Sequence, residues 1–244
     1  WMFNQKAVRI KTKKSETINR QRYFEYKPSQ RPLLDEYIAY KFAKRLNLLV
    51  SDVRLVEFFV NNKSSGIFIE RERLNESFLR RNKIMPVNLY KGEASRNSEK
   101  KIGLAANLDE NPGLWEKISI LNSVDLADYS DLENFTNNIR EAGNSNEKLK
   151  NLLKYGNDKL LARTAILEIL LNQEINDNTH NRRLTIDVWS GKKYIIPHDF
   201  TYNRTKINVE NFNLDTCSTR LFCVLNQSSE FLDLKYDILY SVIK

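Results

Sequence analysis

Short apolar runs along the first third of the chain follow first a strand pattern and then a helix pattern. Residues 7–14 (AVRIKTKK) and 22–27 (RYFEYK) are rich in strand-forming side chains and are separated by a polar turn region. The next apolar residues, Leu34, Ile38 and Phe42, recur at helical spacing. The pattern therefore predicts two strands followed by one helix.

Two further apolar runs predict a β-hairpin. Residues 53–62 (VRLVEFFVNN) and 66–74 (GIFIERERL) flank a short polar stretch, and we place the turn at Gly66. Because both runs carry apolar residues on both faces, we expect the hairpin at the centre of its sheet and not at an edge. The first 75 residues thus describe a small sheet with one long helix packed on it.

The rest of the chain is mainly helical in pattern. Residues 92–157 are rich in Asn, Glu, Lys and Ser, which predicts a polar insertion or a loosely packed region with short helices such as 131–142. Residues 157–175 (NDKLLARTAILEILLNQEI) are apolar nearly all round, which is typical of a helix buried in a core. Helical periodicity returns over residues 219–244. The fold class is therefore predicted to be α+β.

Polar residues that could hold ions surround a short strand pair after the buried helix. Asp177 and Asn181 precede the strand-like run 192–196 (KKYII), and Asp199 follows it. Asn and Asp also favour turns by bonding to their own backbone, so turn chemistry is the simpler interpretation. A buried helix, a loop with Asp and then Asn, a strand pair and a second Asp is, however, the order in which protein kinases present their catalytic residues.

Composition limits the classes of partner. The 244 residues are 41% hydrophobic, which suffices for one large core or two modest lobes. The formal charge of +8 favours an anionic partner, such as a nucleotide, a nucleic acid, an acidic protein or a membrane surface. No apolar run approaches the roughly 18 to 20 residues that span a bilayer. Cys217 and Cys223 lack the paired spacing of a zinc site, so we expect free thiols or one local disulfide.

Five blocks of sequence, in this order and at similar intervals, resemble the spore coat protein H (CotH) kinase family of bacteria. The blocks are RPLLDEYIAYKFAKRLNL (31–48), GIFIERERLNESFL (66–79), NLYKGE (88–93), NDNTHNRRL (176–184) and YIIPHDF (194–200). The resemblance implies a two-lobed atypical protein-kinase-like fold, with a small lobe of sheet and helix over residues 1–72 and a mainly helical lobe over 73–244. It also implies transfer of phosphate from ATP, with Mg²⁺, to Ser or Thr of a protein, and a location at the spore coat, at the cell envelope or outside the cell.

The resemblance implies a role for five residues in the chemistry. Asp177 matches the catalytic Asp that accepts the proton of the substrate hydroxyl, while Asn181 and Asp199 match the residues that hold magnesium. Glu36 matches the Glu of the helix that follows the lysine-bearing strand, and Lys27 is the best match for the phosphate-binding Lys.

Other features of the nucleotide site are less fixed. Lys13 is the alternative to Lys27 as the phosphate-binding residue. We expect adenine to lie against the backbone of the four residues that follow the second hairpin strand, namely Glu70, Arg71, Glu72 and Arg73. No glycine occurs before Gly66, so the polar turn 13–21 would have to serve in place of a glycine-rich loop. His198 stands where the family usually has Trp.

Three alternatives to an active kinase remain open from the sequence. A kinase-like pseudoenzyme would bind nucleotide or a protein partner without transferring phosphate. A transition-metal hydrolase could use His180 and His198 with nearby carboxylates, although the spacing of the two histidines does not favour it. A nucleic-acid binder would suit the positive charge, but the aromatic residues fall on core-like positions instead of a surface stripe, so nucleic acid is not the expected partner.

Overall fold

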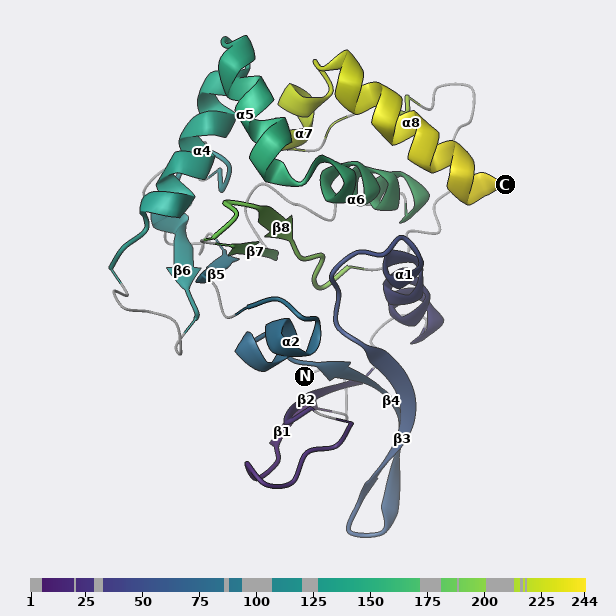
Figure 1. Cartoon of the computed structure of the whole chain (residues 1–244). Coiled ribbons are helices and arrows are strands. Elements are labelled where there is room, and N and C mark those ends of the chain that lie inside the picture. Colours follow the sequence, from purple (N-terminus) through teal and green to yellow (C-terminus); the bar gives the residue numbers. More distant parts are fainter. Residues whose placement is uncertain are drawn as a thin grey trace.

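The chain folds into two antiparallel sheets and a group of helices, an α+β arrangement that confirms the predicted fold class. In the computed structural model the described residues are 6–19, 21–28, 33–85, 88–93, 107–119, 127–171, 181–187, 189–200, 213–215, 217 and 219–244. The first sheet lies at one end of the molecule, the helices α4 to α8 gather at the other, and the second sheet lies between them (Figure 1).

The first sheet has four strands in the order β1-β2-β4-β3, and helix α1 connects β2 to β3. These elements are β1 (Val8–Lys11), β2 (Tyr23–Pro28), α1 (Leu33–Arg45), β3 (Val53–Val60) and β4 (Lys63–Glu72). The predicted order of two strands, one helix and two strands is confirmed.

The pairing of β2 with β4 places four side chains on one face of this sheet. Glu25 lies opposite Arg71, and Lys27 lies opposite Ile69. Residues two apart on a strand point to the same face, so these side chains are neighbours. Polar groups from β2 and β4 therefore meet on the face toward α1.

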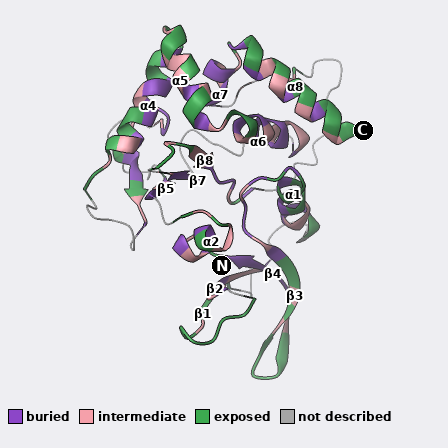
Figure 2. Ribbon diagram, in the orientation of Figure 1, coloured by how far each residue is buried: buried purple, intermediate pink, exposed green. Residues whose placement is uncertain are grey.

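The hairpin formed by β3 and β4 differs from the prediction in its turn and in its position. The turn lies at Asn61 and Asn62, whose φ angles of 49° and 63° are those that a tight hairpin turn requires, while Gly66 lies within β4 with a φ of 92°. Only β4 is central; β3 is an edge strand. Apolar residues on both faces of β3 are consequently exposed, including Phe59, and Figure 2 shows the exposed end of the hairpin.

Helix α1 forms where predicted but buries a different face. Leu34 is 50% exposed and Phe42 is 39% exposed, although both fit an apolar stripe. The buried face instead contains Glu36, Tyr40 and Ala43. Apolar periodicity identified the helix, but the buried stripe runs through Tyr40 and Ala43, which pack in an apolar cluster with residues of the first sheet.

The second sheet has the strand order β6-β5-β7-β8. Most of the helices lie near this sheet (Figure 1). Helix α2 (Glu76–Arg81) leads from β4 toward it, and the side chain of Asn75 caps this helix by accepting a hydrogen bond from the Phe78 N–H at 3.1 Å. The remaining elements are β5 (Asn88–Gly92), the 3₁₀ turn η2 (Pro112–Leu114), β6 (Trp115–Lys117), α4 (Ser130–Ala142), α5 (Asn146–Gly156), α6 (Asp158–Leu171), β7 (Arg182–Ile186), β8 (Lys193–Ile195), α7 (Arg220–Leu225) and α8 (Ser229–Ile243).

The main core includes the segment that we expected to be loosely packed. Leu132, Phe135 and Ile139 of α4 are at most 2% exposed and belong to the same apolar cluster as residues of α6, α7 and the second sheet. The sequence of α4 and α5 is largely polar because their outer faces are polar, while their inner faces are apolar. These two helices therefore contribute to the core.

A second apolar cluster joins the first sheet and α1 to the helices. It contains Tyr40 of α1, Ile69 of β4, Ile166 of α6, Phe200 after β8 and Leu239 of α8. Helix α6 is buried on several faces, as predicted. This cluster fixes the segment after β8 against α1, which brings residues from distant parts of the sequence to one place.

Two further expectations are settled by the described residues. Of the two states proposed for the cysteines, the structure has the local disulfide, which joins Cys217 to Cys223 of α7. Within the ranges that the structure describes, every helix is too short or too polar to cross a membrane.

Candidate active site

Asn181 and Asp199 lie at the same end of the hairpin formed by β7 and β8. The Ile196 N–H donates to the Arg183 carbonyl oxygen at 2.9 Å, so the pairing continues beyond β8. Asn181 directly precedes β7, and Asp199 follows the end of β8 by four residues. The two residues that the sequence assigns to magnesium therefore come from opposite sides of one hairpin.

Both of these residues have an unusual backbone conformation. Asn181 and Asp199 each have a φ of 58°, in the left-handed region that Asn and Asp occupy more readily than other side chains with a Cβ. Residues in this region are enriched at functional sites, where surrounding contacts hold them in place. Pro197, two residues before Asp199, has its own φ fixed by its ring.

The Lys27 amine joins the first sheet to Asp199 and to helix α1. Lys27 Nζ lies 2.9 Å from Asp199 Oδ1 and 3.4 Å from Glu36 Oε2. Lys27 is on β2, and Glu36 is in the first turn of α1. The Lys27 side chain is 33% exposed and that of Glu36 is 11% exposed. Three residues that the sequence assigns to the site thus meet in the structure.

The charges of this group stabilise one another. Burial alone would lower the pKa of Lys27, but the carboxylates of Glu36 and Asp199 outweigh it and raise that pKa above its ordinary value. Burial alone would raise the pKa of Asp199, but the Arg71 guanidinium, followed by Lys27, holds that pKa well below its ordinary range. Both groups are therefore charged at neutral pH.

Arg71 contributes to the site through its side chain, whereas the sequence analysis considered only its backbone. Its Nη1 lies 3.1 Å from Asp199 Oδ1 and 3.6 Å from Glu36 Oε1, and its Nη2 forms an ion pair with Glu25 Oε2. The side chain is only 5% exposed. Its place between three carboxylates gives no signal in the sequence, because the pairing of β2 with β4 is needed to align Arg71 with Glu25.

Tyr40 is a second residue that the sequence analysis missed. Its hydroxyl accepts hydrogen bonds from Arg71 Nη1 at 3.0 Å and from the Asp199 N–H at 3.3 Å. Its ring stacks on Phe200, with ring centroids 4.5 Å apart. The only hint in the sequence is its spacing of four residues from Glu36, which places both on one face of the helix.

The other residues proposed to contact adenine are engaged elsewhere. Glu70 accepts hydrogen bonds from Tyr26 and Arg54, and Glu72 is paired with Arg81, so their side chains point away from Asp199. The backbone is occupied as well. The Glu72 N–H donates to the Asp52 carbonyl oxygen, and the Arg73 N–H donates to the Tyr23 carbonyl oxygen, each at 3.2 Å. An adenine contact in this segment would therefore depend on other backbone atoms.

The remaining candidates divide into three cases. Asp177 and His180 lie outside the described residues. Lys13 follows β1 and is exposed, and its Nζ lies 3.9 Å from Glu16 Oε1. The ion pairs of Asp199 and Glu36 do not include Lys13. His198 has a buried Nδ1, and burial, together with Arg71 and Arg183, lowers its pKa to about 3, so the imidazole is neutral.

The donors at this site fit a magnesium ion bound together with phosphates. The Asp199 side chain is 35% exposed and so remains accessible to a ligand. Mg²⁺ prefers carboxyl and amide oxygens, and it commonly takes one or two of them from protein and the rest from phosphates and water. Asp199 and Asn181 offer this combination. Among the described residues no group of three His, Cys, Asp or Glu side chains is arranged to hold a metal ion.

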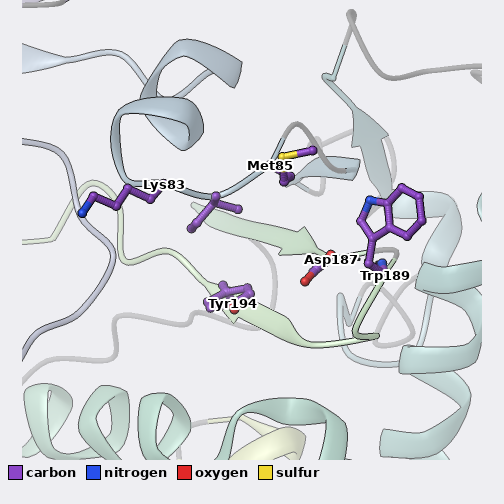
Figure 3. Close-up of a pocket in the computed structure, with 6 residues that line it drawn as sticks. Lys83, Met85, Asp187, Trp189 and Tyr194 are labelled. Carbon is purple, nitrogen blue, oxygen red and sulfur yellow. Dashed lines mark hydrogen bonds between the residues drawn. The ribbon is translucent and has the colours of Figure 1, made fainter.

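An open hollow of about 360 Å³ lies at the other end of the β7–β8 hairpin (Figure 3). It is formed by residues that follow α2, by the turn between β7 and β8 and by one residue of β8, namely Lys83, Ile84, Met85, Asp187, Trp189 and Tyr194. None of these residues belongs to the group around Asp199. The hollow is therefore separate from the candidate active site.

Comparison with protein families identifies the family of the chain. The family described as CotH kinase protein matches residues 10–231 of the chain. Because the match covers most of the chain, the protein belongs to the CotH kinase family, and the resemblance noted in the sequence is confirmed. Membership indicates a kinase-type function. No curated protein matches this chain.

Proposed function

We propose that the protein is an ATP- and Mg²⁺-dependent protein kinase that transfers the γ-phosphate to Ser or Thr of a protein substrate. The observation that supports this most strongly is the contact of Lys27 with both Glu36 and Asp199. In protein kinases a strand Lys pairs with a helix Glu, and both this pair and the magnesium-binding Asp must be in place for transfer.

The order of elements supports the same proposal. Lys27 lies on β2, Glu36 lies on the helix that follows, and two more strands complete the sheet before the chain continues to the helical part. Asn181 and Asp199 then border a strand pair that follows the buried helix α6. This arrangement corresponds to a kinase-like fold with two lobes, divided near residue 72, which is the domain division that we propose.

The proposed reaction uses residues of this chain mainly to position reactants. The substrate hydroxyl oxygen attacks the γ-phosphorus, the bond from that phosphorus to the bridging oxygen breaks, and ADP leaves. The hydroxyl proton passes to the carboxylate of Asp177. Lys27 binds the α- and β-phosphates and is oriented by Glu36. When bound by Asp199 and Asn181, Mg²⁺ would neutralise charge on the phosphates, as in other kinases.

Transfer of label from γ-labelled ATP tests the proposal. Purified protein is incubated with magnesium and a panel of acceptor proteins, and labelled phosphoserine and phosphothreonine are measured in the acceptors and in the chain itself. Wild type is expected to transfer label, and Asp199→Ala is expected to lose the transfer. Asp233→Ala, which removes an exposed carboxylate on α8, is the matched control and is expected to retain it.

A specific observation supports a second candidate, a pseudoenzyme that binds nucleotide without transferring phosphate. Asp199 Oδ1 lies 2.9 Å from Lys27 Nζ, so the ammonium group occupies a carboxylate oxygen that magnesium would need. ATP binding that requires no magnesium, together with no label transfer, would favour this candidate. Family membership supports the spore coat as the proposed location for either candidate.

A further inference from the structure

Besides Lys27, two more residues contact Asp199, namely Tyr40 and Arg71. Neither has a role in the proposed reaction. The Tyr40 hydroxyl accepts the Asp199 N–H at 3.3 Å, and Arg71 Nη1 donates to Asp199 Oδ1 at 3.1 Å. Arg71 Nη1 also donates to the Tyr40 hydroxyl at 3.0 Å. One Tyr–Arg pair thus contacts both the backbone and the carboxylate of Asp199.

Burial separates this pair from the residue that faces the ligand. Tyr40 is 1% exposed and the Arg71 side chain is 5% exposed, whereas the Lys27 side chain is 33% exposed. Lys27 can therefore reach a phosphate from the solvent side. Tyr40 and Arg71 are buried, so they affect a ligand only through their contacts with Asp199.

The backbone of Asp199 requires such support. Its φ of 58° lies in a region that residues with a Cβ occupy at a cost in free energy, and that cost is offset only by surrounding contacts. The Tyr40 hydroxyl supplies one contact through the Asp199 N–H, and the Tyr40 ring stacks on Phe200, the next residue. Tyr40 therefore contacts two consecutive residues, Asp199 through its backbone and Phe200 through its ring.

The other partners of Arg71 keep its guanidinium in place. Glu25 pairs with Nη2, and Glu36 Oε1 lies 3.6 Å from Nη1. These contacts come from β2 and α1, so Arg71 remains fixed when a ligand changes the contacts of Lys27. The Asp199 carboxylate would then keep one cationic partner after Lys27 has moved to the phosphates.

We propose that Tyr40 and Arg71 form a buried clamp that fixes Asp199 in its metal-binding conformation, so that both are positioning residues. This inference rests on the proposed role of Asp199 as the magnesium ligand. The clamp allows Lys27 to leave Asp199 for the nucleotide without loss of the metal site. Lys27 and Arg71 therefore differ in function although both contact the same oxygen.

Removal of the Tyr40 hydroxyl alone tests the clamp. Tyr40→Phe keeps the ring that stacks on Phe200 and loses only the acceptor of the two hydrogen bonds. Binding of Mn²⁺, as a magnetic substitute for Mg²⁺, is measured by electron paramagnetic resonance with a non-hydrolysable ATP analogue present. We expect the Mn²⁺ affinity to fall by about tenfold or more, as happens when residues that orient metal ligands are changed. Tyr37→Phe, on the same helix, is the matched control and should bind as wild type.

Arg71→Lys provides a second, independent variant. It keeps the positive charge between Glu25 and Glu36, which protects the fold, but it loses the fork that reaches Tyr40 and Asp199 together. We expect it to weaken Mn²⁺ binding as Tyr40→Phe does, while binding of the analogue without metal stays within about twofold. A melting curve for each variant shows that the protein is folded at the temperature of the titration.

The outcomes separate the clamp from the kinase proposal. Unchanged Mn²⁺ affinity in folded Tyr40→Phe and Arg71→Lys would overturn the clamp, as would a wild type that binds no Mn²⁺. If wild type binds Mn²⁺ and both variants bind it weakly, the clamp is supported even where wild type transfers no phosphate. That last result would contradict only the proposed kinase activity.

Discussion

Lys27 Nζ and Asp199 Oδ1 lie 2.9 Å apart, although 172 positions separate the two residues in the chain. Lys27 also reaches Glu36, so a strand, a helix and the segment after a hairpin meet at one amine. The contact requires that both sheets and α1 be assembled. It is therefore a property of the whole fold.

Lys27→Met should weaken ATP binding because it removes the only lysine that the described residues place against Glu36 and Asp199. Glu36→Gln should act in the same direction, since the amide no longer orients the amine. Isothermal titration with ATP and magnesium measures both effects. Lys13→Met is the matched control, and a loss of affinity in Lys13→Met with none in Lys27→Met would assign the phosphate-binding role to Lys13.

Asp177→Ala should abolish phosphate transfer while ATP binding stays largely intact. A general base typically contributes a factor of about 10² to 10⁴ in rate, so transfer of label should fall by that order. The loss should appear in the turnover rate and not in the ATP concentration needed for half-maximal rate. Asp177→Ala with full activity would remove this residue from the mechanism.

Glu25→Gln should change how stability depends on pH. Burial alone would raise the pKa of Glu25, but Arg71, followed by Arg9, lowers it from its ordinary value of 4.5 to about 2. A lowered pKa in the folded state means that Glu25 contributes stability above pH 4.5, and that this contribution is lost as the pH falls from 4.5 toward 2. The variant should therefore melt at a lower temperature than wild type at neutral pH.

The difference in melting temperature between wild type and Glu25→Gln should shrink as the pH falls through that window. Glu57→Gln, which changes an exposed carboxylate on β3, serves as the control and should show a smaller difference. Equal melting temperatures of wild type and Glu25→Gln at neutral pH would show that the pair with Arg71 adds no net stability.

The order of elements could be predicted from the sequence because it depends on local periodicity. The sequence segments that form β1, β2, β4 and α6 have clear strand or helix patterns of apolar residues. The position of each element was harder to predict. Strand β3 is as apolar as a central strand, yet it lies at the edge because β4 pairs with β2 as well. Strand order depends on contacts between distant residues, which the pattern within one strand does not contain.

The sequence named only some of the residues that meet at Asp199. The resemblance to the family singled out Asp199, Lys27 and Glu36, which the structure brings together, and their roles in catalysis stay a prediction. It did not point to the side chains of Arg71 and Tyr40, because their roles arise where β4 and α1 face Asp199 in three dimensions. In the sequence, Arg71 looks like any other polar residue of a strand, and Tyr40 looks like any other aromatic residue of a helix.

The most direct test of the account is the effect of ATP on the melting temperature of wild type and of Asp199→Ala, with magnesium and with EDTA. A ligand that binds only the folded state at about 100 times its Kd adds roughly 2.7 kcal/mol to the free energy of unfolding. We predict that ATP stabilises wild type much more with magnesium than with EDTA. In Asp199→Ala that difference should vanish, since the phosphates lose the ion that Asp199 holds. A magnesium-dependent shift of wild-type size in folded Asp199→Ala would contradict the assignment of Asp199 as the magnesium ligand.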